Sequence, residues 1–500
     1  MLMLKKYFFS LFLFLITGPV FAQVFTQVSS NLHGVIDPVM SWIDVKNNHQ
    51  LQAFVAGDYY VNDKHVIVSQ LTVHGKYLRF AASRSPFPAL YRGDAAVADY
   101  DHDGDQDIVM TGLNTQGQPE MRLYRNDGHG HFTVVPQAFT PLTDGSIEWG
   151  DYDHDGDLDI LETGKRYDNK LVTLIYRNDN GVFTEIPVNV PGVYHGVARW
   201  GDYDHDGDLD LLITGNDGNG PFTGLYQNIK NKYYPVKDHF VQLQNSDAQW
   251  GDLDGDSDLD FIISGEDKDG FPDCRIYSNE LNNYFMNVPV SIRSLKSCTI
   301  DLADYDHDGD LDIVMTGESM ERSYTEVYEN ELAFDFKRIL TGIPGVSSGK
   351  AIWGDFDHDG DMDLLVSGIT ICYNFITRIY RNDKNPKVEN GQVTTIQPIP
   401  RLSNGPYYYY VFASCFCDPS GGDHPKYHLF ISNIHKEKRA YELNYKFNAL
   451  LIKAVPNWGK TDSGHRTSNA FKTYREAEAS RMQVIESYKA SGFEVHFLNW

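Results

Sequence analysis

Hydrophobic and polar positions repeat along this chain with a period of about 51 residues. In each period an apolar segment ends at Trp-Gly or at alanine, an acidic nonapeptide follows, and a short apolar run then stops at glycine. A segment with the signature Tyr-x-Asn and one more apolar segment complete the period, as in residues 123–126 and 131–135. Runs of four to six residues that are rich in β-branched and aromatic side chains and bounded by Gly, Asn and Asp indicate strands rather than helices. The pattern therefore predicts four short strands in each period.

Six copies of this unit carry a complete acidic nonapeptide. Successive copies start 52, 51, 50, 52 and 51 residues apart, and the starts are Asp99, Asp151, Asp202, Asp252, Asp304 and Asp355. A weaker copy at residues 42–57 keeps the apolar frame but has Lys46 and Asn48 where the other copies have carboxylates. Four short strands in a unit of about 50 residues are typical of a β-propeller blade. We therefore predict an all-β fold in which residues 23–400 form a seven-bladed β-propeller.

The start of the repeat region predicts how the ring closes. Residues 24–28 (VFTQV) look like the fourth strand of a unit that lacks its first three. An open array of sheets would leave unpaired strand edges, so we expect this segment to pair with the last blade. Eight blades are the alternative, because residues 407–412, 427–432 and 440–445 could supply three strands of an extra blade.

The nonapeptide D-x-D-x-D-G-x-x-D predicts a metal loop. Carboxylates at positions 1, 3, 5 and 9 can converge on one centre, glycine at position 6 permits a tight reversal, and the carbonyl of position 7 adds an oxygen. Several ionised oxygen donors suit Ca²⁺, so we expect about six Ca²⁺ sites. The candidate ligands, with position 7 contributing its carbonyl, are Asp99, Asp101, Asp103, Asp105 and Asp107; Asp151, Asp153, Asp155, Asp157 and Asp159; Asp202, Asp204, Asp206, Asp208 and Asp210; Asp252, Asp254, Asp256, Asp258 and Asp260; Asp304, Asp306, Asp308, Asp310 and Asp312; and Asp355, Asp357, Asp359, Asp361 and Asp363.

Two other interpretations of these loops are weaker. A merely solvated acidic turn would have to hold five mutually repelling aspartates without a counter-ion. An EF-hand needs flanking helices and a glutamate at position 12, where only Glu162 of the six copies fits. The fourth loop departs from the pattern, with Ser257 at position 6 and Gly255 at position 4, so its site is the least secure. The histidines at position 4 are expected to be surface groups, and the Asn48 loop is expected to bind no metal.

This unit resembles the FG-GAP, or VCBS-type, repeat of integrin α-subunit propellers and of many secreted bacterial proteins. The resemblance covers about residues 24–400 and is carried by six near-identical loops in register. It implies that the loops join adjacent strands within a blade. It also implies that they lie on the opposite face from the partner-binding surface, so that calcium would stabilise blades and perform no chemistry.

The two ends of the chain differ from the repeats. Residues 1–22 combine Lys5 and Lys6 with an apolar run and a small-x-small cleavage site, which predicts a secretory signal peptide. Residues 401–500 carry a net charge of +4, against −30 for residues 1–400. There we expect a small α+β module, with a helix at about 474–491 and a closing strand at 493–497. Cys274 and Cys298, in neighbouring units, could form a disulfide.

The overall charge of −26 argues against a nucleic-acid binder and favours bound cations. The chain has no H-E-x-x-H or phosphate-loop motif, so a binding protein is favoured over an enzyme. The sequence therefore predicts a calcium-binding propeller, secreted to the extracellular space, the cell surface or the periplasm, that binds an extracellular protein or glycan. A calcium-dependent polysaccharide-degrading enzyme and a surface-assembly component are the alternatives. The sequence predicts no membrane span after signal cleavage and does not indicate an oligomeric state.

Overall fold

The computed structural model describes residues 25–61, 64–74, 80–237, 239–280, 284–320, 322–331 and 334–382, and further residues between 407 and 498. The latter are 407–409, 411–417, 426–432, 434–437, 465–467, 475, 477, 478, 481, 482, 485, 489 and 494–498. The export segment 1–22 and the suggested strand at 440–445 lie outside the described residues.

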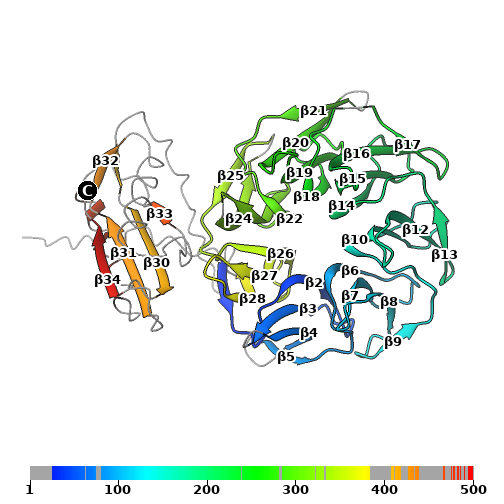
Figure 1. Ribbon diagram of the computed structural model, residues 1–500, viewed down its shortest axis with the longest axis horizontal. Helices are drawn as coiled ribbons and strands as arrows, with labels where there is room; N and C mark the ends of the chain where they lie inside the picture. Colours follow the sequence, from blue (N-terminus) through cyan, green and yellow to red (C-terminus); the bar gives the residue numbers. More distant parts are fainter. Residues whose placement is uncertain are drawn as a thin grey trace, which may run out of the picture.

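Sets of four strands stand around a ring, which confirms the predicted all-β propeller (Figure 1). In each set the strands pair antiparallel, and in the six sets made of consecutive strands the first strand lies nearest the ring axis. Six sets use four consecutive strands: β2 (Ile36–Ile43), β3 (Gln52–Val61), β4 (Lys64–His74) and β5 (Phe80–Arg84); β6 (Tyr91–Ala98), β7 (Asp107–Leu113), β8 (Pro119–Asn126) and β9 (Phe132–Val135); β10 (Thr143–Gly150), β11 (Asp159–Lys165), β12 (Leu171–Asp179) and β13 (Val182–Pro187); β14 (Tyr194–Gly201), β15 (Asp210–Asn216), β16 (Pro221–Asn228) and β17 (Tyr233–Pro235); β18 (Gln244–Gly251), β19 (Asp260–Glu266), β20 (Pro272–Glu280) and β21 (Tyr284–Val288); and β22 (Lys296–Ala303), β23 (Asp312–Ser319), β24 (Arg322–Asn330) and β25 (Phe336–Ile339).

The seventh set joins the two ends of the ring. It contains β26 (Val346–Gly354), β27 (Asp363–Thr370) and β28 (Phe375–Asn382), and its fourth strand is β1 (Phe25–Val28). β1 pairs antiparallel with β28, from Phe25 opposite Asn382 to Val28 opposite Ile379. The predicted closure by residues 24–28 is therefore confirmed for the described part of that segment. The outer edge of β28 is covered by a strand from the start of the chain.

Stacked aromatic side chains join neighbouring blades at five of the interfaces. The residue at position 2 of an acidic loop stacks on the tryptophan of the following inner strand: Tyr152 lies 6.2 Å from Trp200 and Tyr203 lies 6.4 Å from Trp250, with ring planes 4° and 5° apart. The glycine after the tryptophan leaves room for this contact, since a Cβ at Gly150 would lie 2.4 Å from the Trp200 ring. The recurring Trp-Gly and Asp-Tyr-Asp segments are therefore the two halves of one interface between blades.

The C-terminal residues form a separate small sheet. β33 (His465–Thr467), β30 (Val411–Cys417), β31 (Lys426–Ser432) and β34 (Glu494–Leu498) pair in that order, and β29 (Tyr407–Tyr409) pairs with β32 (His435–Glu437). β31 and β34 are parallel, and helical residues precede β34. Ala477 and Ile485 of that helix are buried, as predicted. Within the described residues β30 and β31 belong to this sheet and to no blade.

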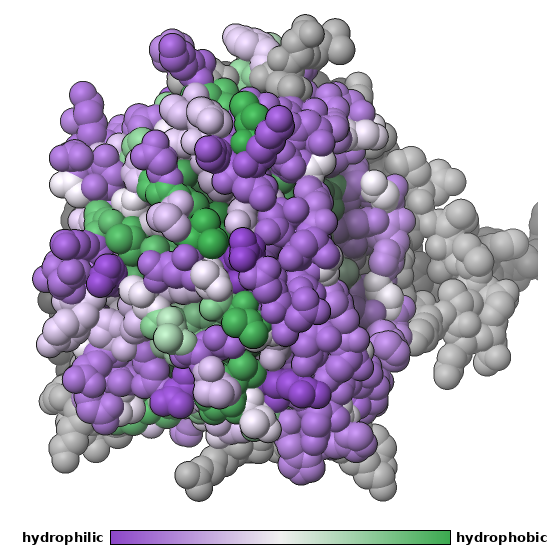
Figure 2. Space-filling view, turned by 90° about the vertical axis from the view of Figure 1, so that its right-hand side faces the viewer, coloured by the Kyte–Doolittle hydropathy of each residue, from purple (hydrophilic) through white to green (hydrophobic). Residues whose placement is uncertain are grey.

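The side of the ring is mostly hydrophilic, with separate hydrophobic areas on the face in view (Figure 2). Outer strands contribute exposed apolar side chains one at a time, such as Val134 and Tyr234. Among the described residues, no helix combines the length and the apolar character that a membrane crossing requires. Single exposed apolar residues are ordinary on a protein surface and need no partner.

Candidate functional site

The six acidic loops join the first and second strands of six blades. The loop at 99–106, for example, connects β6 to β7, which pair directly with Ala98 opposite Asp107. Strands flank the loop on both sides, which confirms that it is not an EF-hand. All six loops lie on the same face of the ring. Every inner strand runs in the same direction, from the opposite face toward its acidic loop.

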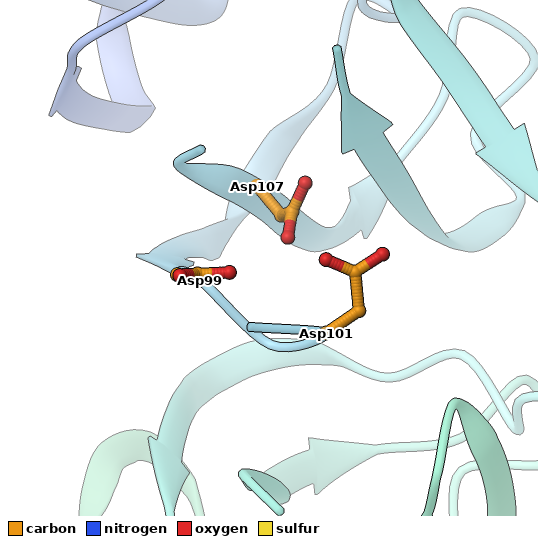
Figure 3. Close-up of side chains that lie close together, drawn as sticks. All are labelled: Asp99, Asp101 and Asp107. Atoms are coloured by element: carbon orange, nitrogen blue, oxygen red, sulfur yellow. The ribbon is translucent and has the colours of Figure 1, made fainter. Parts of the chain in front are cut away.

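The loops bring carboxylates together. Figure 3 shows the side chains of Asp99, Asp101 and Asp107 pointing toward a common centre. In each of five such groups, one oxygen from each of three aspartates lies within 4.8 Å of the other two. The groups are Asp99, Asp101 and Asp107; Asp151, Asp153 and Asp159; Asp202, Asp204 and Asp206; Asp252, Asp254 and Asp260; and Asp304, Asp306 and Asp308.

The aspartate at position 1 shapes the loop backbone. In the first loop, the N–H of Asp103 donates to Asp99 Oδ1 (3.1 Å) and the N–H of Gly104 donates to Asp99 Oδ2 (3.0 Å). The N–H of Asp105 donates in turn to Asp103 Oδ1 (3.1 Å). The short side chain of aspartate suits such local turns. The same residues that offer oxygen ligands therefore fold the loop.

The aspartate at position 9 is a buried connector. Asp107 has no exposed surface, and its two carboxylate oxygens accept the N–H of Tyr100 (3.3 Å) and the N–H of Asn126 (2.7 Å). Burial raises the pKa of Asp107 to about 7. The same two contacts recur in every loop, at Asp159, Asp210, Asp260, Asp312 and Asp363.

The asparagine of the Tyr-x-Asn signature ties each loop to the preceding blade. The side-chain amide of Asn279 donates to the carbonyl of Tyr203 at 2.7 Å, and that of Asn330 donates to the carbonyl of Leu253 at 2.9 Å. Sequence reasoning noted this signature but gave it no role. Its recurrence 18 or 19 residues after position 9 was the available signal.

Several carboxylate oxygens in the loops lack a hydrogen bond from any described residue. At position 3, Oδ1 is buried and unpaired in Asp101, Asp153, Asp204 and Asp357. At position 1 the same holds for Oδ1 of Asp151 and Asp202. A buried unsatisfied acceptor is costly unless something else satisfies it. These oxygens fit a hard cation that takes carboxylate ligands.

The side chains of position 7 face away from the carboxylate group. Asp157 Oδ2 accepts the N–H of Asn180 (2.7 Å), and Asp208 Oδ2 accepts the N–H of Lys230 (3.3 Å). Both donors lie in the turn between the third and fourth strands of the same blade. The position-7 carboxylate therefore caps that turn, which leaves its backbone carbonyl for the role that the sequence suggested.

The histidines at position 4 are exposed, as predicted, and reach toward the next loop. His102 Nε2 lies 2.7 Å from the carbonyl oxygen of Gly156, and His205 Nε2 lies 3.1 Å from Asp258 Oδ1. These contacts between neighbouring loops were not foreseen, because the spacing of one repeat does not reveal which loop is next in space.

The two irregular loops have clear local structures. In the fourth loop Gly255 and Ser257 both have positive φ (81° and 78°), and the Oδ1 of Asp254 accepts the N–H of Asp256 (3.2 Å). This hydrogen bond uses Oδ1 of the position-3 aspartate, which is the oxygen that is unpaired in Asp101, Asp153, Asp204 and Asp357. In the weak first copy, Asp44 accepts backbone N–H groups from Lys46, Asn48 and His49. Backbone N–H groups of the loop itself therefore occupy the oxygens of the Asp44 carboxylate.

The opposite ends of the inner strands form a second candidate site, which we call the mouth. Every inner strand begins with a β-bulge, where its pairing with the second strand skips a residue. The first bulged residue has a φ between 42° and 59°, and these seven residues, the mouth ring, are Asp37, Arg92, Asp144, His195, Asn245, Ser297 and Ser348. All seven line one cavity of about 470 Å³.

The bulge brings backbones into close contact. A Cβ at Gly93 would lie 1.9 Å from the carbonyl oxygen of Thr111, and one at Gly145 would lie 1.8 Å from that of Thr163. Left-handed backbone at a residue other than glycine costs about 1–3 kcal/mol and is common at ligand sites. The mouth is therefore a strained feature that recurs in every blade among the described residues.

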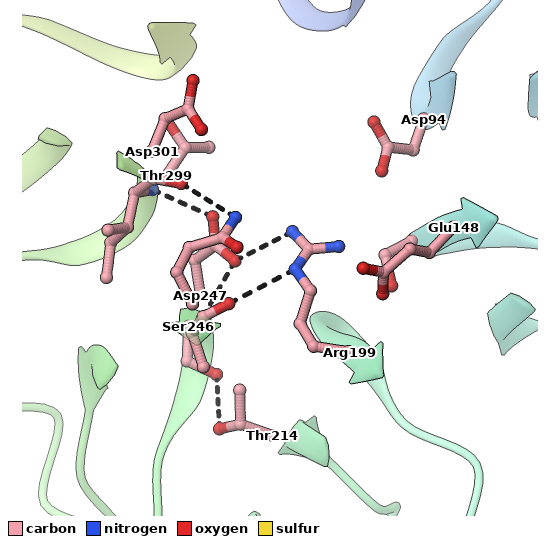
Figure 4. A network of polar contacts seen from close by, with 12 residues as sticks. Asp94, Glu148, Arg199, Thr214, Ser246, Asp247, Thr299 and Asp301 are labelled. Atoms are coloured by element: carbon pink, nitrogen blue, oxygen red, sulfur yellow. Dashed lines mark hydrogen bonds and ion pairs between the residues drawn. The ribbon is translucent and has the colours of Figure 1, made fainter. Parts of the chain in front are cut away.

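Charged side chains near the mouth link neighbouring inner strands (Figure 4). Arg199 extends toward Asp247 and bonds one of its oxygens at 3.2 Å. The other oxygen of Asp247 accepts the N–H of Ile300 in the next blade (2.9 Å), and Asp301 similarly accepts the N–H of Trp353 (2.8 Å). These carboxylates accept hydrogen bonds from backbone N–H groups at the unpaired edges of inner strands. Most of the charged side chains in the channel therefore have a structural role.

The structure answers the open question of a disulfide between Cys274 and Cys298: they are not bonded. Cys274 and Cys298 are free thiols that pack in the same hydrophobic cluster, and Cys298 Sγ lies 3.0 Å from the carbonyl oxygen of Ser264. The cluster buries both sulfurs as small apolar groups. Their proximity follows from neighbouring blades, as the sequence suggested, but their side chains do not bond.

The fold and the six loops define a class of protein, a β-propeller in which six blades carry an acidic loop between their first two strands. The family model described as FG-GAP-like repeat matches residues 99–162 and 304–366. This chain is therefore a β-propeller that contains FG-GAP-like repeats. No curated protein matches the sequence.

Solved structures give distant likenesses. A thermostable family-43 glycoside hydrolase has a TM-score of 0.30 and 9% identity, covering 54% of this chain and 97% of the other. A mutant of Aleuria aurantia lectin, in complex with α-methyl-L-fucoside, has a TM-score of 0.35 and 11% identity, covering 57% and 90%. A GH43_1 enzyme from Xanthomonas citri has a TM-score of 0.30 and 9% identity, covering 53% and 94%. These likenesses are too distant to bear on ligand or reaction.

Proposed function

We propose that this chain is a secreted propeller that binds an extracellular protein or glycan and whose blades are stabilised by calcium. The single observation that carries the calcium assignment is the set of buried, unpaired position-3 oxygens, such as those of Asp101 and Asp204, beside other carboxylates. A divalent cation at that centre would satisfy these oxygens and offset the repulsion within the group.

The position-9 aspartates add to this argument. Burial raises the pKa of Asp159 to about 7 and that of Asp210 to about 8. A nearby cation favours the ionised form of such a carboxylate. Because position 9 also holds the loop to the third strand, an ion bound there would connect three strands of a blade through one group.

Binding is assigned to the mouth. It is the end of the channel opposite the acidic loops, it is a cavity, and it gathers one side chain from each blade. The export signal expected at residues 1–22 would place this surface outside the cytoplasm, where calcium is plentiful. An array of glycans and extracellular proteins, probed with the full chain in calcium, tests this part; absence of any binding partner would favour a purely structural role.

Calcium removal should lower the thermal midpoint of the mature chain by about 5 °C or more. A single site at a calcium concentration a hundredfold above its dissociation constant contributes about 2.7 kcal/mol, and several such sites would shift the midpoint by several degrees. Melting is followed by circular dichroism in calcium, in magnesium and in EDTA. Equal midpoints in calcium and in EDTA would reject structural calcium, and magnesium serves as the control for general ionic effects.

The residue between Tyr and Asn in the third strand should tune each loop's affinity for calcium. Arg125 places its guanidinium 3.0 Å from Asp101 and 3.1 Å from Asp103, whereas Gln227 bonds Asp204 at the equivalent place. In a solvated setting, the positive charge of an arginine at that distance would weaken the binding of a calcium ion by about 1 kcal/mol. This corresponds to an affinity for calcium that is about fivefold lower.

The reciprocal variants Arg125→Gln and Gln227→Arg test this directly. We expect Arg125→Gln to tighten one calcium site about fivefold and Gln227→Arg to weaken another by a similar factor, as measured by calorimetric titration with calcium. Each variant is the other's matched control. A shift in the same direction for both would show that the arginine does not act through its charge.

A further inference from the structure

Three consecutive side chains of the mouth ring have no hydrogen-bonding partner among the described residues. They are the hydroxyls of Ser297 and Ser348 and the carboxylate of Asp37, at the start of β22, β26 and β2, and these three strands are neighbours around the ring. On the other arc the side chains bond one another: Arg92 Nε lies 2.6 Å from Asp144 Oδ1, and His195 lies 2.8 Å from the side chain of Asn245. The mouth therefore has one self-satisfied arc and one open arc.

The charges of the cavity leave the same carboxylate unpaired. Four aspartates line the cavity with two arginines, one lysine and His195, and each arginine and the lysine pairs with one aspartate. The pairs are Arg92 with Asp144 (2.6 Å), Arg199 with Asp247 (3.2 Å) and Lys350 with Asp94 (2.8 Å). Asp37 is the fourth aspartate, and no described cationic group lies within ion-pair distance of it. The open arc thus carries an uncompensated negative charge.

The surroundings of Asp37 favour an incoming cation. Burial, Asp58 and Asp144 raise its pKa to about 6, while Arg92 and His195 act in the opposite direction. A cation placed against this carboxylate would stabilise its ionised form. The backbone holds Asp37 in a left-handed conformation (φ 45°), so its position is fixed before any ligand arrives.

We propose that the open arc binds the primary ammonium group of an amino sugar. A primary ammonium has three N–H donors and no acceptor, which matches the carboxylate of Asp37 and the two hydroxyls of Ser297 and Ser348. This inference rests on the proposed binding function and names the ligand chemistry of that site.

An amino sugar fits the cavity better than a lysine side chain. The walls are mostly charged groups, hydroxyls and glycines, with few apolar side chains such as Val197 to cover a lysine's methylene stem. A sugar instead carries hydroxyl groups beside its ammonium, and these can bond the polar side chains of the opposite arc. The cavity of about 470 Å³ is within the usual range for small-ligand pockets.

The test uses the full chain in calcium and a short oligomer of glucosamine with free amines. The comparison probes are the N-acetylated oligomer, a glucose oligomer of equal length and Nα-acetyl-lysine amide. Calorimetry should show the free-amine oligomer binding at least tenfold more tightly than all three. Equal binding of the glucose oligomer would overturn the role of the ammonium, and tighter binding of the lysine derivative would overturn the choice of a sugar.

Variants locate the site. Asp37→Asn keeps the size of the side chain and tolerates the left-handed backbone, and it should weaken binding of the free-amine oligomer at least tenfold. The matched control Asp168→Asn, an exposed aspartate in the turn between β11 and β12, should change it less than twofold. Unchanged melting midpoints show that both variants fold. Unaltered binding by Asp37→Asn would overturn the inference.

A second readout follows from the ionisation of Asp37. Because its pKa is about 6, the ratio of the affinity of the unsubstituted chain for the free-amine oligomer to that of Asp37→Asn should fall about tenfold as the pH drops from 7 to 5, since protonation of the amine affects both chains alike. If Asp37→Asn leaves binding of the free-amine oligomer unaltered while the array reveals other ligands, this inference fails and the proposed binding function stands. If the array reveals no ligand and calcium has no effect on melting, the proposed function fails as well.

Discussion

Replacing Asp210 by alanine should lower the free energy of unfolding by about 2–6 kcal/mol. Asp210 has no exposed surface, and its carboxylate accepts the N–H of Tyr203 (3.2 Å) and the N–H of Asn228 (2.7 Å). Without it, two buried donors lose their acceptor, and each unsatisfied donor costs about 1–3 kcal/mol. Chemical denaturation in calcium and in EDTA measures the loss.

Two further results make this test specific. In EDTA a substantial loss should persist, because the two hydrogen bonds do not depend on an ion. The exposed Asp168, replaced by alanine, is the matched control and should change stability by no more than about 0.5 kcal/mol. A loss below about 1 kcal/mol for Asp210→Ala in EDTA would contradict the connecting role of position 9.

Replacing Phe25 by alanine should cost about 3–5 kcal/mol, the usual range for a buried phenylalanine. Phe25 has no exposed surface, and its ring lies 6.1 Å from those of Tyr305 and Trp353. It is also the first residue of β1, whose pairing with β28 closes the ring. The variant therefore weakens both a core contact and the closure of the propeller.

Denaturation and size-exclusion chromatography check this expectation. If the closing strand detaches, the free edge of β28 can pair with another chain, so we expect some association of the variant at high concentration. Phe271 is 68% exposed, and Phe271→Ala is the matched control with an expected change of no more than about 0.5 kcal/mol. Equal stability of the two variants would show that β1 does not hold the ring.

The local elements were predictable because their determinants are local. Short β-rich runs bounded by Gly, Asn and Asp predicted the strands, and the repeat period predicted the blade. The segment at 24–28 was identified as the missing fourth strand because it matched the end of a unit. The acidic nonapeptide predicted a carboxylate-lined loop, since its turn is built by its own aspartates, as at Asp99 and Asp103.

Other features depend on which blades become neighbours, and one repeat does not contain that information. The bond from Asn279 to Tyr203 joins residues 76 positions apart, and His102 meets Gly156 in the next loop. Cys274 and Cys298 were correctly placed near each other, but side-chain packing rather than proximity decided that they remain thiols.

The sequence by itself determined the repeating unit, the all-β blade and the carboxylates that each loop can present, because periodicity and turn chemistry act over a few residues. The tertiary structure decided the mouth. Asp37, Ser297 and Ser348 occupy equivalent positions of three repeats but no single residue type marks that position, Asp37 lies 260 residues before Ser297 in the chain, and only closure of the ring brings their inner strands together around one cavity.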